Sequence, residues 1–407
     1  MRIAESGKIT GLAAIPEPAV LNARRTLAVA GLAHAIHDGF TSTIYVLLPV
    51  WQAQFGLSYG ALAAMRALYI GSLAALQIPS GRLAQRIGVT TVLVLGTLMS
   101  AAGYAVCGLS GSIVGLCIGL VATGVGGSTQ HPLASGAVSR AYGSGARGPL
   151  GTYNFAGDVG KALLPPAVGF LLTVLDWRLS LWLVAGLGSV AALAIALLMP
   201  ATGEARVKTM TPTDTHRAAG RGGFGLLLGV GMLDGVAGVI VLLFLPTVLK
   251  VKGASLPEIG FALSLLFIGG ACGKAACGWL GVRLGLLRTV AITEIGTAVS
   301  ILLVLWLPLL PCLLVLPLLG IMQNGTSSVL YGTVPELVRG NTVEHGFAVF
   351  YSGTLGASAL APVLYGWLGD QVGPDWALVA AATTALAAVP LMILLAPYLT
   401  GPAESKS

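Results

Sequence analysis

Twelve apolar segments, most of them about 20 residues or longer, dominate this sequence. They cover residues 27–49, 59–79, 90–109, 113–138, 149–174, 179–199, 225–247, 257–277, 289–308, 310–335, 346–368 and 376–398. A helix of about 20 apolar residues spans the hydrocarbon core of a bilayer. Only 9% of the 407 residues are charged, against about 25% in soluble domains. The sequence therefore predicts an all-α membrane protein with twelve transmembrane helices and excludes a soluble protein.

The polar parts of the chain exclude several other classes. The first 26 residues lack the order of regions found in a signal peptide, so we expect the first apolar segment to remain as a membrane anchor. All five cysteines fall within or at the edge of apolar segments and show no metal-binding or disulfide spacing, which favours small core residues. No phosphate-binding Gly-x4-Gly-Lys-Ser/Thr motif is present, so ATP-driven pumping has no support, and no cofactor is predicted.

The distribution of Lys and Arg predicts the orientation in the membrane. With the N-terminus in the cytoplasm, only Arg178, Lys250 and Lys252 fall in outside loops, and the other loop cations are cytoplasmic. We therefore expect a multi-pass protein of a bacterial inner membrane with both termini cytoplasmic. The net charge of +7 is then a topology signal that suits anionic lipid headgroups, and nucleic acid is not an expected partner.

The two halves of the chain repeat at an offset of about 196 residues. Asp38 and Asp234 match, and each is followed by Gly and an apolar run that ends at Pro49 or Pro246. Further matches in the same order are Gly124 with Gly320, Gly136 with Gly332, Gly157 with Gly353, Gly160 with Gly356, and Pro166 with Pro362. Two parallel six-helix repeats are typical of transporters whose substrate site lies between the halves near the midplane.

The repeat predicts the organisation of the chain. We expect a cytoplasmic tail over 1–26, a six-helix bundle over 27–199, a cytoplasmic linker over 200–224, a second six-helix bundle over 225–398 and a short tail over 399–407. The two bundles are expected to be pseudo-symmetric.

A loop motif occurs once in each half and carries a resemblance to a known family. Residues 81–88 read GRLAQRIG, and residues 278–285 read GWLGVRLG. They resemble the Gly-x3-Asp-Arg-x-Gly motif that follows the second helix of major facilitator superfamily transporters, although Gln85 and Val282 replace the acid. The resemblance implies alternating access between two six-helix bundles, without the charge latch that the acid forms. The gating residues that it implies are Gly81, Arg86, Gly88, Gly278, Arg283 and Gly285.

Within that superfamily, the sequence most resembles the fosmidomycin-resistance-type exporters. The likeness covers the His34 to Asp38 stretch of the first segment, the stretch from Gly127 to Pro132, and part of the fifth segment. In the fifth segment, Gly157, Gly160 and Pro165 also resemble the glycine–proline signature of drug antiporters. These resemblances imply export as the direction of transport and a structural or gating role for the three residues.

The first segment holds the strongest candidates for proton coupling. His34, His37 and Asp38 lie at spacings of three and four residues and so share one side of a helix. Ionisable residues at membrane depth are costly, and groups of this type bind and release protons when their surroundings alternate between wet and dry. Asp234 is the partner of Asp38 by repeat. The alternative interpretation is a polar cluster that locks the first helix to its neighbours.

Two basic residues at membrane depth are candidates for binding an anion. Arg66 lies in an otherwise apolar run, and its alternative role is a structural ion pair with Asp38 or Asp234. Lys274 precedes Gly278 by four residues, and oxalate and monocarboxylate carriers of the superfamily place a substrate-binding Arg at a similar position. The alternative for Lys274 is a side chain that extends to the membrane interface.

Other polar residues at membrane depth are weaker candidates for lining a substrate route. Asp158 and Lys161 are spaced to neutralise each other within one helix. Glu294 lies close in sequence to Arg288, which indicates an interfacial ion pair. The remaining candidates are Asn154, one turn before Asp158; His131, beside an expected helix break; and the repeat-related polar patch of Gln323, Asn324 and Tyr331.

The sequence predicts a secondary transporter that couples the efflux of a small polar, preferably anionic, organic compound to protons. Uptake of organic anions or monocarboxylates, multidrug antiport, and a non-transporting sensor or scaffold are alternatives. An intramembrane metalloenzyme with ligands among His34, His37, Asp38 and His131 is disfavoured, because no Glu stands at the spacing of a His-Glu-x-x-His site. The expected partners are a small-molecule substrate, protons and the lipid bilayer, with the protein acting as a monomer and not as an enzyme.

Overall fold

The computed structural model describes residues 17–200, 221–337 and 343–399, and within them the chain is helical, without a strand. The first half forms α1 (Glu17–Phe55), α2 (Tyr59–Ile87), α3 (Val89–Leu109), α4 (Ile113–Gly127), α5 (Gln130–Tyr142), the 3-10 turn η1 (Gly143–Gly145), α6 (Arg147–Val174) and α7 (Trp177–Leu198). The second half forms α8 (Arg221–Val251), α9 (Leu256–Leu284), α10 (Leu286–Trp306), α11 (Leu309–Leu337), α12 (Val343–Val372) and α13 (Pro374–Leu399).

The helices agree with the twelve expected membrane segments. The fourth segment is split into α4 and α5 at Ser128 and Thr129, and Pro132 follows in the first turn of α5, where its missing N–H costs no helical hydrogen bond. Ten segments in the described chain are long and apolar enough to cross a membrane, and α4 with α5 counts as one of them. The two others, α1 and α12, are 39 and 30 residues long. The centre of the expected linker, residues 1–16 and residues 400–407 lie outside the described residues. Residues 17–26 of the expected N-terminal tail belong to α1 instead.

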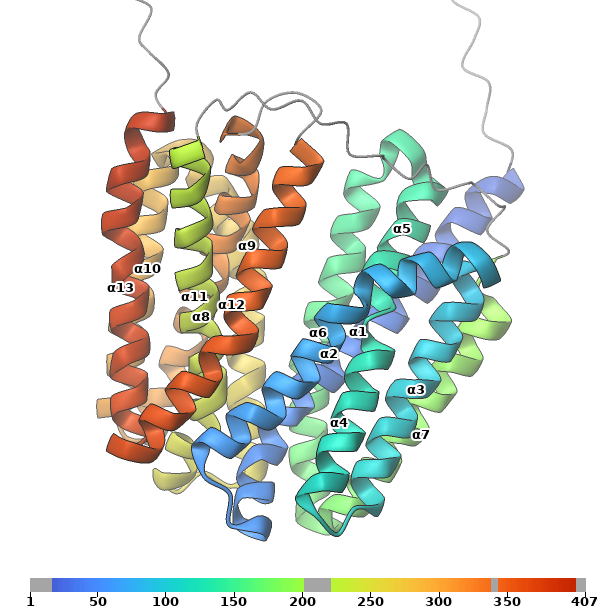
Figure 1. The fold of residues 1–407 in the computed structure, drawn as a ribbon, viewed down its shortest axis with the longest axis horizontal. Coiled ribbons are helices and arrows are strands. Elements are labelled where there is room, and N and C mark those ends of the chain that lie inside the picture. Colours follow the sequence, from blue (N-terminus) through green and yellow to red (C-terminus); the bar gives the residue numbers. More distant parts are fainter. Residues whose placement is uncertain (1–16, 201–220, 338–342, 400–407) are drawn as a thin grey trace, which may run out of the picture.

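The helices form two bundles, α1 to α7 and α8 to α13 (Figure 1). Within the first bundle α1 packs on α6 and α3 packs on α4 and α7, and within the second bundle α9 packs on α11 and α13 packs on α8 and α10. Between the bundles the main contacts are α6 with α9 and α2 with α12. These two pairs exchange under the internal repeat, as expected for pseudo-symmetric halves.

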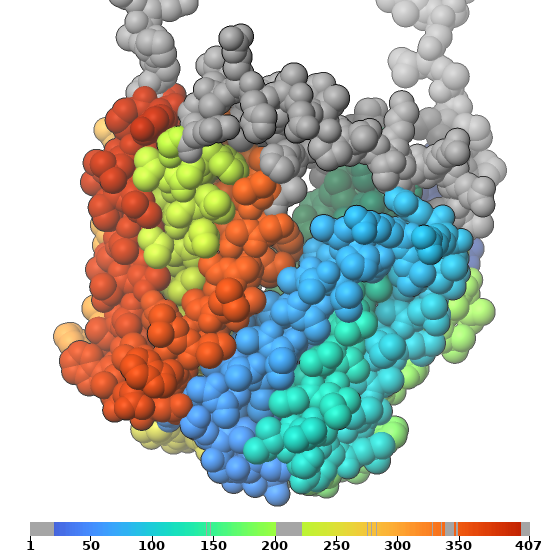
Figure 2. All heavy atoms as spheres, viewed as in Figure 1, coloured from blue at the N-terminus to red at the C-terminus, as the bar shows by residue number. Residues whose placement is uncertain are grey.

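The bundles pack against each other at one end of the molecule, opposite the end where α1 begins and α13 ends. In Figure 1 the start of α1 and the end of α13 lie toward the top, and α2 and α12 converge below. Figure 2 shows their surfaces in contact there. One apolar core joins Trp51 of α1 with Phe244 of α8, whereas the halves toward the described ends keep separate cores. Asp370 of α12 accepts hydrogen bonds from the Tyr59 and Gly60 backbone N–H groups at 2.6 and 2.9 Å.

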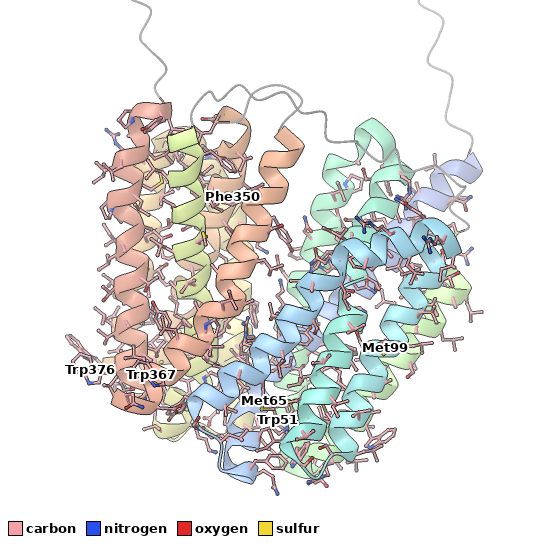
Figure 3. All side chains as sticks on the ribbon, in the orientation of Figure 1. Trp51, Met65, Met99, Phe350, Trp367 and Trp376 are labelled. Atoms are coloured by element: carbon pink, nitrogen blue, oxygen red, sulfur yellow. The ribbon has the colours of Figure 1, made fainter. Side chains whose placement is uncertain are left out.

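Exposed tryptophans mark this end of the molecule. Trp367 and Trp376 are 58% and 62% exposed and lie at the lower end of the second bundle in Figure 3. Trp306, at the end of α10 that leads into the same face, is 83% exposed. Exposed tryptophans are typical of the level of the lipid headgroups, so these three side chains fit a membrane boundary.

The repeated loop motifs form the turns at the other end of α2 and α9. Gly88 and Gly285 connect α2 to α3 and α9 to α10 with φ of +92° and +78°, which favour glycine because it has no Cβ. Arg283 lies over the Trp279 ring, with its guanidinium carbon 4.2 Å from the centroid, and Arg86 is exposed in the last turn of α2. Gly81 has open space at its Cα. Gly278 lies within α9, and its surroundings are outside the described residues.

Candidate functional site

Asp38 of α1 is the centre of a charged cluster in the first bundle. Its Oδ2 lies 2.8 Å from the Lys161 Nζ of α6 and 3.3 Å from the His34 Nε2 one turn earlier on α1. Its Oδ1 lies 3.9 Å from the His131 Nε2 of α5. The Asp38 side chain is only 10% exposed, whereas those of Lys161 and His131 are 29% and 41% exposed. A buried carboxylate is thus held beside basic groups that reach toward an open space.

The orientation of His34 is set by α6. Its Nδ1 lies 2.9 Å from the Tyr153 carbonyl oxygen, and its ring stacks on the Tyr153 ring at 4.2 Å. A carbonyl oxygen only accepts, so Nδ1 carries the hydrogen and Nε2 is directed at Asp38. Gly157 leaves the necessary room, because a Cβ there would lie 2.7 Å from Asp38 Oδ2.

A chain of charged groups continues from this cluster to the second bundle. Lys161 Nζ lies 3.5 Å from Asp158 Oδ1 on the same helix. Both Asp158 oxygens accept hydrogen bonds from Lys274 Nζ of α9 at 2.8 Å. The expected pairing of Lys161 with Asp158 within α6 is therefore the longest of the three contacts in this series of charged groups. The sequence Asp38–Lys161–Asp158–Lys274 alternates in charge and crosses the interface between the bundles.

Arg66 of α2 is buried without an acidic partner in the described part of the chain. Its Nε donates to the Tyr45 hydroxyl at 2.8 Å, and its Nη1 donates to the Ser358 carbonyl oxygen of α12 at 3.3 Å. The side chain is 5% exposed, and the alternative role, an ion pair with Asp38 or Asp234, is not seen among the described residues. A guanidinium has five N–H donors, and these two bonds leave donors and a full positive charge for an anion.

His37 is directed away from the Asp38 cluster, although it is the neighbouring residue. Its Nε2 lies 3.3 Å from Thr97 Oγ1 of α3, which also accepts from Gln130 Nε2 at 3.1 Å. Thr97 donates its own hydrogen to the Leu93 carbonyl oxygen at 2.8 Å, so His37 Nε2 donates to Thr97. His37 therefore ties α1 to α3 and makes no ion pair with Asp38.

The repeat-related acid, Asp234 of α8, has different surroundings. It faces the carboxyl group of Glu294 on α10, and the two interact directly. The expected interfacial ion pair of Glu294 with Arg288 is wrong, because Glu294 is 1% exposed inside the bundle while Arg288 is exposed. The repeat thus conserves the position of the acid but not its partners.

Comparison with known proteins identifies the family. The model of the Major Facilitator Superfamily matches residues 30–223 and 226–407, which is nearly the whole chain. This chain belongs to the major facilitator superfamily. A search of curated protein sequences gave no match.

Solved structures of other transporters share the fold. A bacterial homologue of the human lysosomal transporter Spinster, in an inward-facing and occupied conformation, is similar with a TM-score of 0.76 and 15% identity, over 95% of this chain and 98% of the other. The nucleoside transporter NupG gives 0.78 and 12%, over 91% and 99%. A POT family transporter bound to a thioalcohol-conjugated peptide gives 0.75 and 14%, over 93% and 97%.

Membership of this superfamily establishes a multi-pass membrane transporter rather than an enzyme. The family model describes the superfamily as a whole, so the likeness to fosmidomycin-resistance-type exporters stays a prediction. The three donor atoms of His34, Asp38 and His131 lie within 4.8 Å of one another, as a metal site requires. The Lys161 ammonium already provides a positive charge 2.8 Å from the same carboxylate, which fits an ion-pair cluster better than a metal centre.

The other expected site residues lie apart from the charged chain. The Gln323 amide lies against Gly238 of α8, and Asn324 packs on Gly270 of α9 and donates to the Gly320 carbonyl oxygen of its own helix at 3.3 Å. The Tyr331 ring meets the Phe350 ring of α12 at 5.2 Å (Phe350 is labelled in Figure 3). Asn154 is exposed on α6. Pro165 lies against α9, where a Cβ on Gly260 would approach its carbonyl oxygen to 2.7 Å.

Two tyrosines that sequence analysis did not select contact residues of α1 beside the site. Tyr69 of α2, three residues after Arg66, lies with its hydroxyl 2.6 Å from Thr41 Oγ1, one turn from His37 on α1. Tyr153 supplies the carbonyl oxygen that orients His34. The spacing of Tyr69 from Arg66 on one helix face could have indicated its role, but a backbone partner such as the Tyr153 carbonyl leaves no sequence signal.

Proposed function

We propose that this transporter couples the export of a small organic anion to protons by alternating access between its two bundles. The observation that carries the proposal is Arg66, a buried guanidinium between the bundles with no acid beside it in the described chain. The other basic groups at this depth, Lys161 and Lys274, are matched by Asp38 and Asp158. The excess charge at the interface is therefore positive, which favours an anionic substrate over a cationic drug.

The charged chain provides a route by which a proton could act on the interface. A proton on Asp38 discharges the carboxylate and releases Lys161, whose next acid is Asp158 at 3.5 Å. Lys161 then competes for the carboxylate that Lys274 holds across the interface. Protonation in the first bundle thus weakens a bond between the bundles and frees Lys274 to meet an anion. His34 and His131, both beside Asp38, are the proposed exchange partners for that proton.

Further parts of the proposal rest on the sequence. Export is preferred because of the resemblance to fosmidomycin-resistance-type exporters. We propose that the termini lie in the cytoplasm, because Lys and Arg concentrate on that side, and that the membrane is the inner membrane of a bacterium. We also propose that it acts as a monomer, since the charged chain and Arg66 come from one polypeptide.

Proteoliposomes that contain a pH-sensitive dye test this function. A panel of small organic anions, phosphonates among them, and a second panel of cationic drugs are added under an imposed proton gradient. We expect anion-dependent proton movement that Asp38→Asn abolishes while substrate exchange survives, and that Arg66→Ala weakens. Lys250→Gln, which removes an exposed cation at the end of α8, is the matched control and should transport normally.

Two outcomes would contradict the proposal. Proton movement driven only by cationic drugs would make the protein a multidrug antiporter and Arg66 a structural residue. Unchanged proton-driven flux in Asp38→Asn would remove Asp38 from the coupling mechanism. Arg66→Lys separates charge from geometry, because Lys keeps the charge but loses the planar fork of donors.

A further inference from the structure

Two buried carboxyl groups face each other inside the second bundle, away from the charged chain. Asp234 of α8 and Glu294 of α10 are 9% and 1% exposed. Their side chains interact directly, and neither forms an ion pair with a Lys, Arg or His of the described chain. Two adjacent carboxylates at this depth repel each other without water to screen them, so a bound positive charge stabilises the pair.

One oxygen of this pair and two oxygens on neighbouring helical turns have no hydrogen-bond partner among the described atoms. Glu294 Oε1, Thr297 Oγ1 and Gln323 Oε1 have no hydrogen-bond partner among the described atoms, although their residues are more than nine-tenths buried. Thr297 follows Glu294 by one turn of α10, on the same face. The Gln323 amide of α11 lies against Gly238, one turn after Asp234, where a Cβ would be 2.8 Å from its nitrogen. Buried polar atoms without partners are rare, and oxygen ligands of this kind favour a hard cation.

Among the described residues, two basic side chains on neighbouring helices have other partners: Lys274 of α9 pairs with Asp158, and Arg66 of α2 bonds to Tyr45 and to the Ser358 carbonyl oxygen. Thr326 of α11 donates to Thr293 Oγ1 of α10 at 2.8 Å, which closes one side with hydroxyl groups. Tyr331, also on α11, is the titratable side chain that interacts with Asp234 from that helix. From α12, the Ser358 hydroxyl lies beside Gly235, where a Cβ would approach it to 2.8 Å. The described part of α13 carries one carboxylate, Asp375, which is exposed in its first turn.

We propose that Asp234 and Glu294 form a monovalent-cation site within the second bundle, where a shared proton or a sodium ion joins α8 to α10. Either occupant supplies one positive charge and so relieves the repulsion between the two carboxylates. The site is separate from the Asp38 cluster and does not depend on the transported substrate being an anion. Its occupant would hold α8 against α10 and so stabilise the bundle.

Thermal unfolding of the full-length purified protein tests this site without a transport assay. The protein is heated at pH values from about 6 to 9 in either sodium or choline buffers. If sodium is the occupant, the Tm rises with sodium concentration at constant pH, as for any ligand that binds only the folded state. If a proton is the occupant, the Tm falls as pH rises in choline, because the two carboxylates lose the proton between them. Either response should span about 3 °C or more.

Two variants show whether the change in Tm comes from this site or from general effects of pH or salt on the protein. Glu294→Gln should remove the response, whereas Glu336→Gln, the same change at an exposed position of α11, should keep it. If Glu294→Gln fails to fold, Asp234→Asn serves in its place, and an infrared band of a protonated carboxyl group in the wild type tests the proton directly. The same dependence on pH and sodium in wild type, Glu294→Gln and Glu336→Gln would overturn the proposal.

Discussion

The bond between Lys274 and Asp158 should set the balance between the conformation described here and any conformation in which α6 and α9 separate. Lys274 Nζ lies 2.8 Å from both Asp158 oxygens. At an effective dielectric constant of about 20, two unit charges about 3 Å apart attract by roughly 5 kcal/mol. The Lys274 side chain is 39% exposed, so water screens the pair. Hydrogen bonds to charged groups typically contribute about 1.5–3 kcal/mol, so we expect about 2 kcal/mol.

A difference of about 2 kcal/mol changes the ratio of two conformations by roughly 30-fold. Lys274→Gln and Asp158→Asn should each shift the protein away from this conformation, and the double variant should add little, because both substitutions remove the same bond. The shift is measurable as a distance distribution between spin labels at positions 140 and 336, exposed sites near the ends of α5 and α11, after the native cysteines are replaced.

In the variants we expect a second, shorter distance between the two labels. It would arise because the bundles close at the end of the molecule where α1 begins and α13 ends. Lys250→Gln should keep the wild-type distribution, because it removes a cation without touching the interface. Unchanged distributions in both single variants, or effects that add independently in the double variant, would refute the reasoning.

Two other contacts allow simpler tests. Gly160→Ala should lower the unfolding temperature measured by scanning fluorimetry, because its Cβ would lie 1.8 Å from the Ala35 carbonyl oxygen, an overpacking worth about 1–3 kcal/mol. Gly151→Ala on the same helix, with no atom within 4 Å of its Cβ, is the control, and equal losses in both would contradict the packing argument. Asp370→Asn should weaken the contact between α12 and the start of α2 by about 1 kcal/mol, because Asp370 accepts hydrogen bonds from the first N–H groups of α2. The label distances should report the resulting change in population. Asp375→Asn should not weaken this contact, and equal shifts in the two variants would reduce the effect to surface charge.

The number and position of the membrane helices could be predicted from sequence because the bilayer leaves few choices. An apolar segment in hydrocarbon satisfies its backbone hydrogen bonds only as a helix or a closed barrel, so the length of each segment nearly specifies its structure. The repeat around Asp38 and Asp234 then predicted two equivalent halves. The ends of elements were less certain, and α1 begins at Glu17 rather than at residue 27 because polar residues continue a helix beyond the membrane.

The partners of the charged residues could not be predicted in the same way. Glu294 lies six positions after Arg288, which places them about 120° apart around a helix, so their closeness in sequence did not make them a pair. His37 is 100° around α1 from Asp38 and therefore meets α3 instead of the cluster. Local spacing did bring Lys161 near Asp158, but the shorter bond goes to Lys274, 116 residues away.

The sequence by itself determined that this chain crosses a membrane in twelve segments, repeats once and carries ionisable residues at membrane depth. Hydropathy and periodicity are properties of single segments, so they need no knowledge of how the helices pack. Only the tertiary structure decided that Asp38 pairs with Lys161, that Asp158 holds Lys274 across the bundles, that Arg66 has no acid beside it in the described chain, and that Asp234 faces Glu294. Pairing between distant residues depends on which helix faces come together, and that is decided by packing.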